Sequence, residues 1–239
     1  MKEPFKDISL VFLPVIHITS PERVLIQTQR AVEAGANGLW LINHGGHTTG
    51  FKYLIDTCDK VRKAHPNLWI GLNFLDLEPL DALEYLPEGA NGLWVDNGGV
   101  AEKQNGGFNI RCAEQLWRRT QIHRPDILLF GGVAFKYRDE GSVKDVAGIA
   151  EAALPYMDVV TTSGPGTGHA ADIGKIRRMS RAIGANNLGL ASGLSADNLS
   201  GFSEHVKHLI ISSSISDNSG ELDLAKMREF RLAVDTLSL

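Results

Sequence analysis

Cysteine is scarce in this sequence. Among 239 residues there are two cysteines, Cys58 and Cys112, and both fall in segments whose apolar residues recur with helical spacing. Thiols in such positions predict reduced residues of a hydrophobic core, and their small number excludes the dense disulfide framework of a small secreted protein.

Long apolar runs and an excess of positive charge are also missing. No stretch approaches the roughly 18 apolar residues that a helix needs to cross a bilayer, and residues 1–7 are rich in charged side chains. We therefore expect a cytoplasmic protein without a membrane segment. The 24 Lys and Arg against 28 Asp and Glu give a net charge of −4. Such a balance provides no cationic surface for nucleic acid, and we expect no nucleic-acid partner.

What the sequence does contain is a regular alternation of two patterns. Short apolar runs lie at 10–17, 38–43, 69–73, 92–96, 127–130, 158–162, 187–191 and 208–212. Segments with helical spacing follow them, the first of which begins with a capping Ser20 and with Pro21 at the first helical position. The later helical segments are 51–64, 78–85, 110–123, 142–153, 171–183, 195–201 and 223–237.

Alternating strands and helices require a parallel sheet, and strands that are apolar on both sides must be covered on both faces. A closed barrel and an open doubly wound sheet both meet these conditions. The first run is followed by HITSPER instead of the G-x-G-x-x-G of nucleotide-binding open sheets. We therefore predict that residues 1–239 form one α/β domain, a (β/α)8 or TIM barrel, for which about 250 residues is typical. Trp40, Trp69 and Trp94 sit within the predicted strands and are expected to pack in the core.

The catalytic candidates follow from the place where barrels carry their chemistry, which is the C-terminal ends of the strands. His17 and Asp96 end the first and fourth runs, and Lys136 follows the fifth. These three side chains are candidates for proton transfer or for stabilising an oxyanion. Asn43, His44 and Asn73 end neighbouring runs and are candidates for substrate binding.

The last three strand ends are rich in glycine and hydroxyl side chains, in the motifs TTSGPGTG, ASGLSADN and ISSSIS. Small residues expose backbone N–H groups, and Ser195 and Ser216 are predicted to begin short helices whose N-termini attract anions. Phosphate sites recur in barrels after strands seven and eight. We therefore predict a phosphate-binding cup made by Ser163, Gly164, Ser192, Gly193, Ser213 and Ser214.

A metal site is a weaker alternative. His44, His47 and Asp96 would make an incomplete ligand set for metal-dependent hydrolysis, but the H-G-G-H spacing matches no zinc signature. We predict neither a metal nor a redox cofactor.

Several of these motifs resemble the BtpA family over most of the chain. The likeness is carried by VIH ending at His17, the turn that begins at Asn43, IGLNFL around Asn73, FKY around Lys136, and most specifically the three glycine- and serine-rich motifs. The resemblance implies a barrel related to phosphate-binding barrel enzymes.

The sequence also departs from that family pattern. Acidic residues that the family carries after strand two are replaced by Ile42 and Gly46, and an Asp and two His around strand five by Gly132, Ala134 and Tyr137. Two functions stay open. The first is an enzyme that acts on a small phosphorylated metabolite, a sugar phosphate or phosphoribosyl compound, by isomerisation, epimerisation or group transfer. The second, favoured by the replaced groups, is a non-catalytic assembly or regulatory factor. A homo-oligomer is compatible with both.

Overall fold

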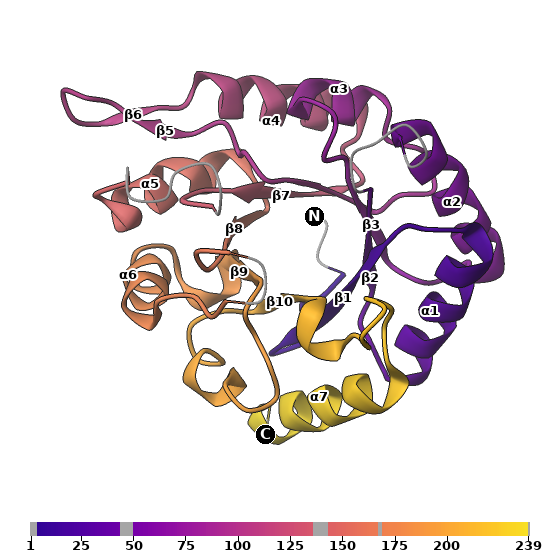
Figure 1. Ribbon diagram of the computed structural model, residues 1–239. Helices are drawn as coiled ribbons and strands as arrows, with labels where there is room; N and C mark the ends of the chain where they lie inside the picture. The colour runs from indigo at the N-terminus through magenta and orange to yellow at the C-terminus, as the bar shows by residue number, and fades with distance from the viewer. Residues whose placement is uncertain (1–3, 44–49, 136–142, 167–168, 239) are drawn as a thin grey trace.

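The protein folds as a closed eight-stranded parallel barrel surrounded by helices, as the sequence predicts (Figure 1). The computed structural model describes residues 4–43, 50–135, 143–166 and 169–238. The barrel strands are β1 (Val11–His17), β2 (Leu39–Ile42), β3 (Ile70–Asn73), β4 (Gly92–Val95), β7 (Leu128–Gly132), β8 (Val159–Thr162), β9 (Leu188–Ala191) and β10 (His208–Ile211). The barrel closes where β1 pairs with β10 on one side and with β2 on the other.

The helices form the outer ring in Figure 1. The described residues contain α1 (Pro21–Glu33), α2 (Phe51–Ala64), α3 (Pro79–Glu84), α4 (Arg111–His123), α5 (Val146–Ala153), α6 (Ile173–Ile183) and α7 (Leu224–Leu237). Short 3₁₀ turns are η1 (Leu154–Tyr156), η2 (Ala185–Asn187), η3 (Leu199–Gly201) and η4 (Ser213–Ile215). The predicted start of the first helix is confirmed, because Ser20 accepts a hydrogen bond from the Arg23 N–H at 3.3 Å and Pro21 follows it. No helix among the described residues is long and apolar enough to cross a membrane.

The helix predicted at 195–201 is wrong. In its place the chain makes a turn and the three-residue η3. The side chain of Asn198 accepts a hydrogen bond from the Ser195 N–H at 2.9 Å and donates one to the Gly193 carbonyl at 2.8 Å. This local bonding gives the backbone an alternative to helical hydrogen bonds.

A hairpin that the sequence analysis did not predict follows β4. It consists of β5 (Ala101–Glu102) and β6 (Phe108–Asn109), and Figure 1 shows it projecting beyond the helical ring. Its turn contains Gly106 and Gly107 with φ of 84° and 75°, a backbone region in which glycine is not strained.

Because side chains alternate along each strand, the buried residues separate into two cores. The larger core lies between the strands and the helices and includes Cys58, whose pKa burial raises to about 12. The smaller core fills the inside of the barrel and contains Trp40, Trp69 and Trp94, so their predicted packing role is confirmed. The predicted core position is wrong for Cys112, which is exposed on α4.

Glycines on the inner face of the barrel make room for the tryptophans. A Cβ atom at Gly71 would lie 2.2 Å from Trp40 Cζ3, and one at Gly92 would lie 2.6 Å from Trp69 Cζ2. Trp40 in turn contacts Trp69 and Trp94 edge to face, at centroid distances of 5.0 and 5.7 Å. The inside of the barrel is therefore packed aromatic core and not a channel.

Substituting Gly71→Ala should force Trp40 out of its position. We expect a loss in the free energy of unfolding of about 1–3 kcal/mol, the usual cost of overpacking, measured by urea denaturation. Gly201→Ala is the matched control, since nothing lies within 4 Å of a Cβ atom there. Equal stability of the two variants would contradict this account of the barrel interior.

His208 lies at the N-terminal end of the barrel interior, between Phe130 and Phe5 at centroid distances of 5.3 and 6.1 Å. Burial lowers its pKa to about 3, and the charge of Lys207 acts in the same direction. An unfolded histidine takes up a proton near pH 6.5. Between those two values the unfolded chain binds the extra proton, so this residue destabilises the fold progressively as pH falls below about 6.5.

The variant His208→Leu should therefore lose part of the acid sensitivity. We expect its free energy of unfolding to fall less steeply between pH 6 and pH 5 than that of the unaltered protein, by about 1 kcal/mol per pH unit. His123→Leu, at an exposed position on α4, is the control. Parallel pH curves for the His208 variant and the unaltered protein would show that His208 is not held neutral.

Candidate functional site

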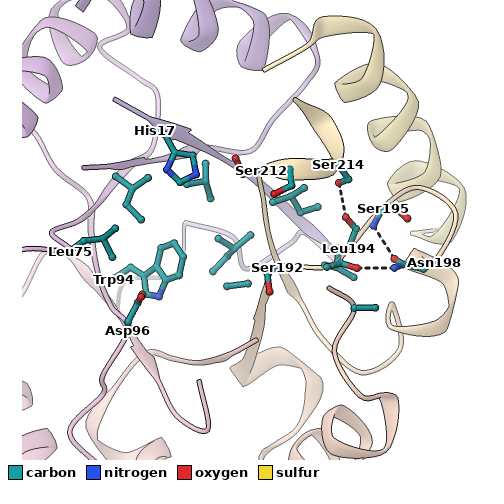
Figure 2. Close-up of a pocket in the computed structure, with 18 residues that line it drawn as sticks. His17, Leu75, Trp94, Asp96, Ser192, Leu194, Ser195, Asn198, Ser212 and Ser214 are labelled. Carbon is teal, nitrogen blue, oxygen red and sulfur yellow. Dashed lines mark hydrogen bonds between the residues drawn. The ribbon is translucent and has the colours of Figure 1, made fainter. Parts of the chain in front are cut away.

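A cavity of about 600 Å³ opens at the C-terminal ends of the barrel strands, where the sequence analysis places the function. Its walls come from β1, β2, β4, β9 and β10 and from the loops after β3, β4, β8, β9 and β10. Figure 2 shows Leu75 and Trp94 on one side, Ser195, Asn198 and Ser214 on the opposite side, and His17 and Ser192 between them.

The loops after β9 and β10 line this cavity and carry unbonded backbone donors. Among the described residues no acceptor is bonded to the backbone N–H groups of Gly193, Leu194, Ser213 or Ser214. Ser214 Oγ donates to the Leu194 carbonyl at 2.6 Å and so ties the two loops together. The result is a group of fixed N–H dipoles, a recurrent type of anion-binding concavity.

Ser192 stands out in its backbone and in its side chain. Its φ is 100°, a region that non-glycine residues occupy at a cost of about 1–3 kcal/mol. Its Oγ is buried and has no hydrogen-bond partner among the described residues. Strain and an unsatisfied hydroxyl at one residue of a cavity wall are typical of a ligand-binding position.

The end of β8 is placed differently from the prediction. Ser163 and Gly164 do not line the cavity. Ser163 is fully buried and its Oγ donates to the Gly164 carbonyl at 3.0 Å. A Cβ atom at Gly164 would lie 2.3 Å from the His169 carbonyl oxygen, and one at Gly193 would lie 2.1 Å from the same atom. The backbone at His169 thus packs against both glycines, which leaves Gly193 at the cavity and Gly164 behind it.

The prediction that Ser195 and Ser216 begin helices is wrong for both. The Ser195 N–H is bonded to Asn198, and Ser216 follows η4 instead of starting it. The short helix after β10 begins at Ser213, so two unbonded N–H groups lie at Ser213 and Ser214.

His17 and Asp96 both line the cavity, which brings together two of the three predicted catalytic residues. Asn73 does not line it, but its Nδ2 donates to Asp96 Oδ1 at 3.0 Å. Asn73 is 1% exposed, so this contact fixes the orientation of the Asp96 carboxylate from within the barrel wall.

Asn43 is also fully buried and does not line the cavity. Its Nδ2 donates to Asp76 Oδ1, and its Oδ1 accepts from the Leu75 N–H at 2.9 Å. Both ends of its amide therefore hold the loop after β3, which carries Leu75 to the mouth of the cavity.

Lys136, His44 and His47 lie outside the described residues. Within the described part of the chain no cluster of His, Cys, Asp or Glu could hold a metal ion. The cavity lining contains neither Lys nor Arg within that part, and Asp96 is its acidic residue. The groups of the described lining that could hold an anion are N–H dipoles and hydroxyl groups.

Trp94, Leu75 and Asn198 are cavity residues that sequence reasoning missed. Trp94 was assigned to packing alone, yet it belongs to the inner core and to the cavity wall. The strand period could have revealed it, since Trp94 lies two residues before Asp96 and therefore on the same face of its strand.

Comparison with solved structures finds the same architecture in several enzymes. The phosphoribosyl anthranilate isomerase of Thermus thermophilus matches with a TM-score of 0.65 and 17% sequence identity, covering 95% of this chain and 100% of the isomerase. The tryptophan synthase alpha subunit of Legionella pneumophila matches with a TM-score of 0.67 and 12% identity, covering 98% and 96%.

A phosphoribosyl anthranilate isomerase in complex with reduced 1-(o-carboxyphenylamino)-1-deoxyribulose 5-phosphate matches with a TM-score of 0.60 and 16% identity, covering 95% and 100%. Likeness at this level of identity shows the fold alone. Comparisons of the sequence with protein families and with curated proteins found no match.

Proposed function

We propose that this protein is a phosphate-binding barrel enzyme that acts on a small phosphorylated metabolite, a sugar phosphate or a phosphoribosyl compound. The observation that carries the proposal is one cavity that combines unbonded N–H donors after β9 and β10 with His17 and Asp96. Phosphate sites of barrels recur in this position.

The phosphate would bind to the N–H groups of Gly193, Leu194, Ser213 and Ser214, with the Ser192 hydroxyl beside them. Oriented dipoles of this kind bind an anion without reorganising, even where no cationic side chain is present. Fixing the phosphate would place the rest of the metabolite over the barrel axis, toward His17 and Asp96.

His17 and Asp96 would then exchange protons with the carbon or oxygen atoms of the metabolite. A positioned general acid or base contributes about 10²–10⁴-fold to a rate. Isomerisation, epimerisation and group transfer all use such a pair. Lys136 is proposed to add a positive charge, and His44 further hydrogen bonds, from segments outside the described residues.

Two matched structures agree with this class of substrate. One is an isomerase named for a phosphoribosyl compound, and the other contains a deoxyribulose 5-phosphate derivative. The BtpA resemblance points in the same direction, since it implies a phosphate-binding barrel.

A non-catalytic assembly or regulatory factor is the second candidate, and the replaced family residues favour it. Where the resemblance expects polar groups, Ile42 gives the cavity an apolar wall. At Gly132 a side chain has no space, because a Cβ atom would lie 2.2 Å from the Asp96 carbonyl oxygen. A factor would keep the loops proposed to bind phosphate and would bind its ligand without converting it.

Inorganic phosphate and ribose 5-phosphate should both stabilise the protein against thermal unfolding. The stabilisation follows RT ln(1 + [L]/Kd), about 2.7 kcal/mol at 100 times Kd. Ser213→Asp places a carboxylate next to the proposed donors at an exposed position, and we expect it to abolish the stabilisation by repulsion. Ser200→Asp, an exposed serine outside the cavity, is the control with the same added charge.

Stabilisation that survives in Ser213→Asp, or that Ser200→Asp removes equally, would place the anion elsewhere and contradict the proposal. The compounds that bind should next be incubated with the protein and followed by phosphorus NMR. A new phosphorylated product supports the enzyme, whereas unchanged bound compound across the whole set supports the factor.

A further inference from the structure

The cavity has an apolar half that phosphate binding does not use. Ile42 on β2, Leu75 after β3 and Trp94 on β4 form one wall, and Figure 2 shows Leu75 and Trp94 across the cavity from the serine-rich loops. These three strands are consecutive in the barrel, so the wall is continuous.

This wall disfavours a ligand that carries a hydroxyl on every carbon. A sugar hydroxyl buried against Ile42 and Leu75 loses its bonds to water and finds no side-chain acceptor in return. An apolar group in the same place gains from leaving water. Selection between the two is therefore set by the chemistry of the wall and not by cavity size.

Trp94 gives the wall an aromatic face. The residue is 5% exposed and belongs both to the inner core and to the cavity lining, so packing holds it in place. An aromatic ring of a ligand packs well against such a fixed aromatic side chain.

Charge further restricts the part of the ligand that packs against this wall. Neither Lys nor Arg occurs in the described part of the cavity lining, and the Asp96 carboxylate lies beside Trp94 in Figure 2. A carboxylate on the ligand at this end of the cavity would therefore meet repulsion from Asp96.

We infer that the substrate is a phosphate monoester joined by a short linker to an uncharged, apolar ring, which packs against Ile42, Leu75 and Trp94. This inference rests on the proposed phosphate-binding function and narrows its substrate class. The phosphate end anchors the molecule, and the ring end provides the selectivity against bare sugar phosphates.

Titration calorimetry with four compounds tests it: inorganic phosphate, ribose 5-phosphate, phenethyl phosphate and para-carboxyphenethyl phosphate. Burial of the ring should make phenethyl phosphate bind about tenfold more tightly than inorganic phosphate or ribose 5-phosphate. The para-carboxylate should remove most of that gain.

Two leucine variants locate the ring. Leu75→Gln, at a residue 40% exposed at the cavity mouth, should weaken phenethyl phosphate roughly threefold or more and leave inorganic phosphate within about twofold. Leu232→Gln makes the same change on α7, at a residue that is 68% exposed and outside the cavity, and should alter neither affinity.

The outcomes separate the two proposals. If none of the four compounds binds, the phosphate-binding function fails and this inference fails with it. If inorganic phosphate binds but phenethyl phosphate is no tighter, or if ribose 5-phosphate or the carboxylated compound is the tightest, the inference alone is overturned. Equal losses in both leucine variants would also overturn it, because the ring would then lie elsewhere.

Discussion

Three tryptophans packed inside the barrel are the constraint on which the rest of this structure depends. Trp40 contacts Trp69, Trp94 and Phe130. Trp40 and Trp69 fit because Gly71 and Gly92 on the neighbouring strands have no side chain. The aromatic rings fill the interior from the N-terminal ends of the strands to its middle. The part beyond Trp94, at the C-terminal ends of the strands, is left as the cavity.

The same packing positions the polar residues of the site. Asn73 lies two residues after Gly71, and Asp96 two residues after Trp94. Each therefore faces the inside of the barrel, one layer nearer the C-terminal ends of the strands. At that level Asn73 donates to Asp96 and holds its carboxylate at the cavity. The side proposed to bind an anion is built separately, by the loops after β9 and β10. Ser214 bonds the second loop to the first, and Asn198 holds the turn within the first. One half of the mouth thus follows from strand register and the other from loop hydrogen bonds.

This division explains what the sequence could predict. The strands were predictable because each is a short apolar run between helical segments, and His17 and Asp96 because they end such runs. Asn43 and Asn73 both end apolar runs, yet Asn43 follows β2 and bonds Asp76, whereas Asn73 is the last residue of β3 and bonds Asp96. Nor does composition reveal that the backbone at His169 packs over Gly164 and Gly193, or that Asn198 replaces a helix with a turn. The contact between His169 and Gly193 joins loops that are far apart in the sequence, and the Asn198 turn depends on side-chain bonds to its own loop.

The central claim is that backbone N–H groups of two loops bind a phosphate at the mouth of the barrel. Proton–nitrogen correlation spectra recorded during titration with inorganic phosphate observe those groups directly. The account predicts that the amide signals of Gly193, Leu194, Ser213 and Ser214 move furthest and saturate together. Amide signals that stay in place, or shifts concentrated at residues away from these two loops, would contradict it.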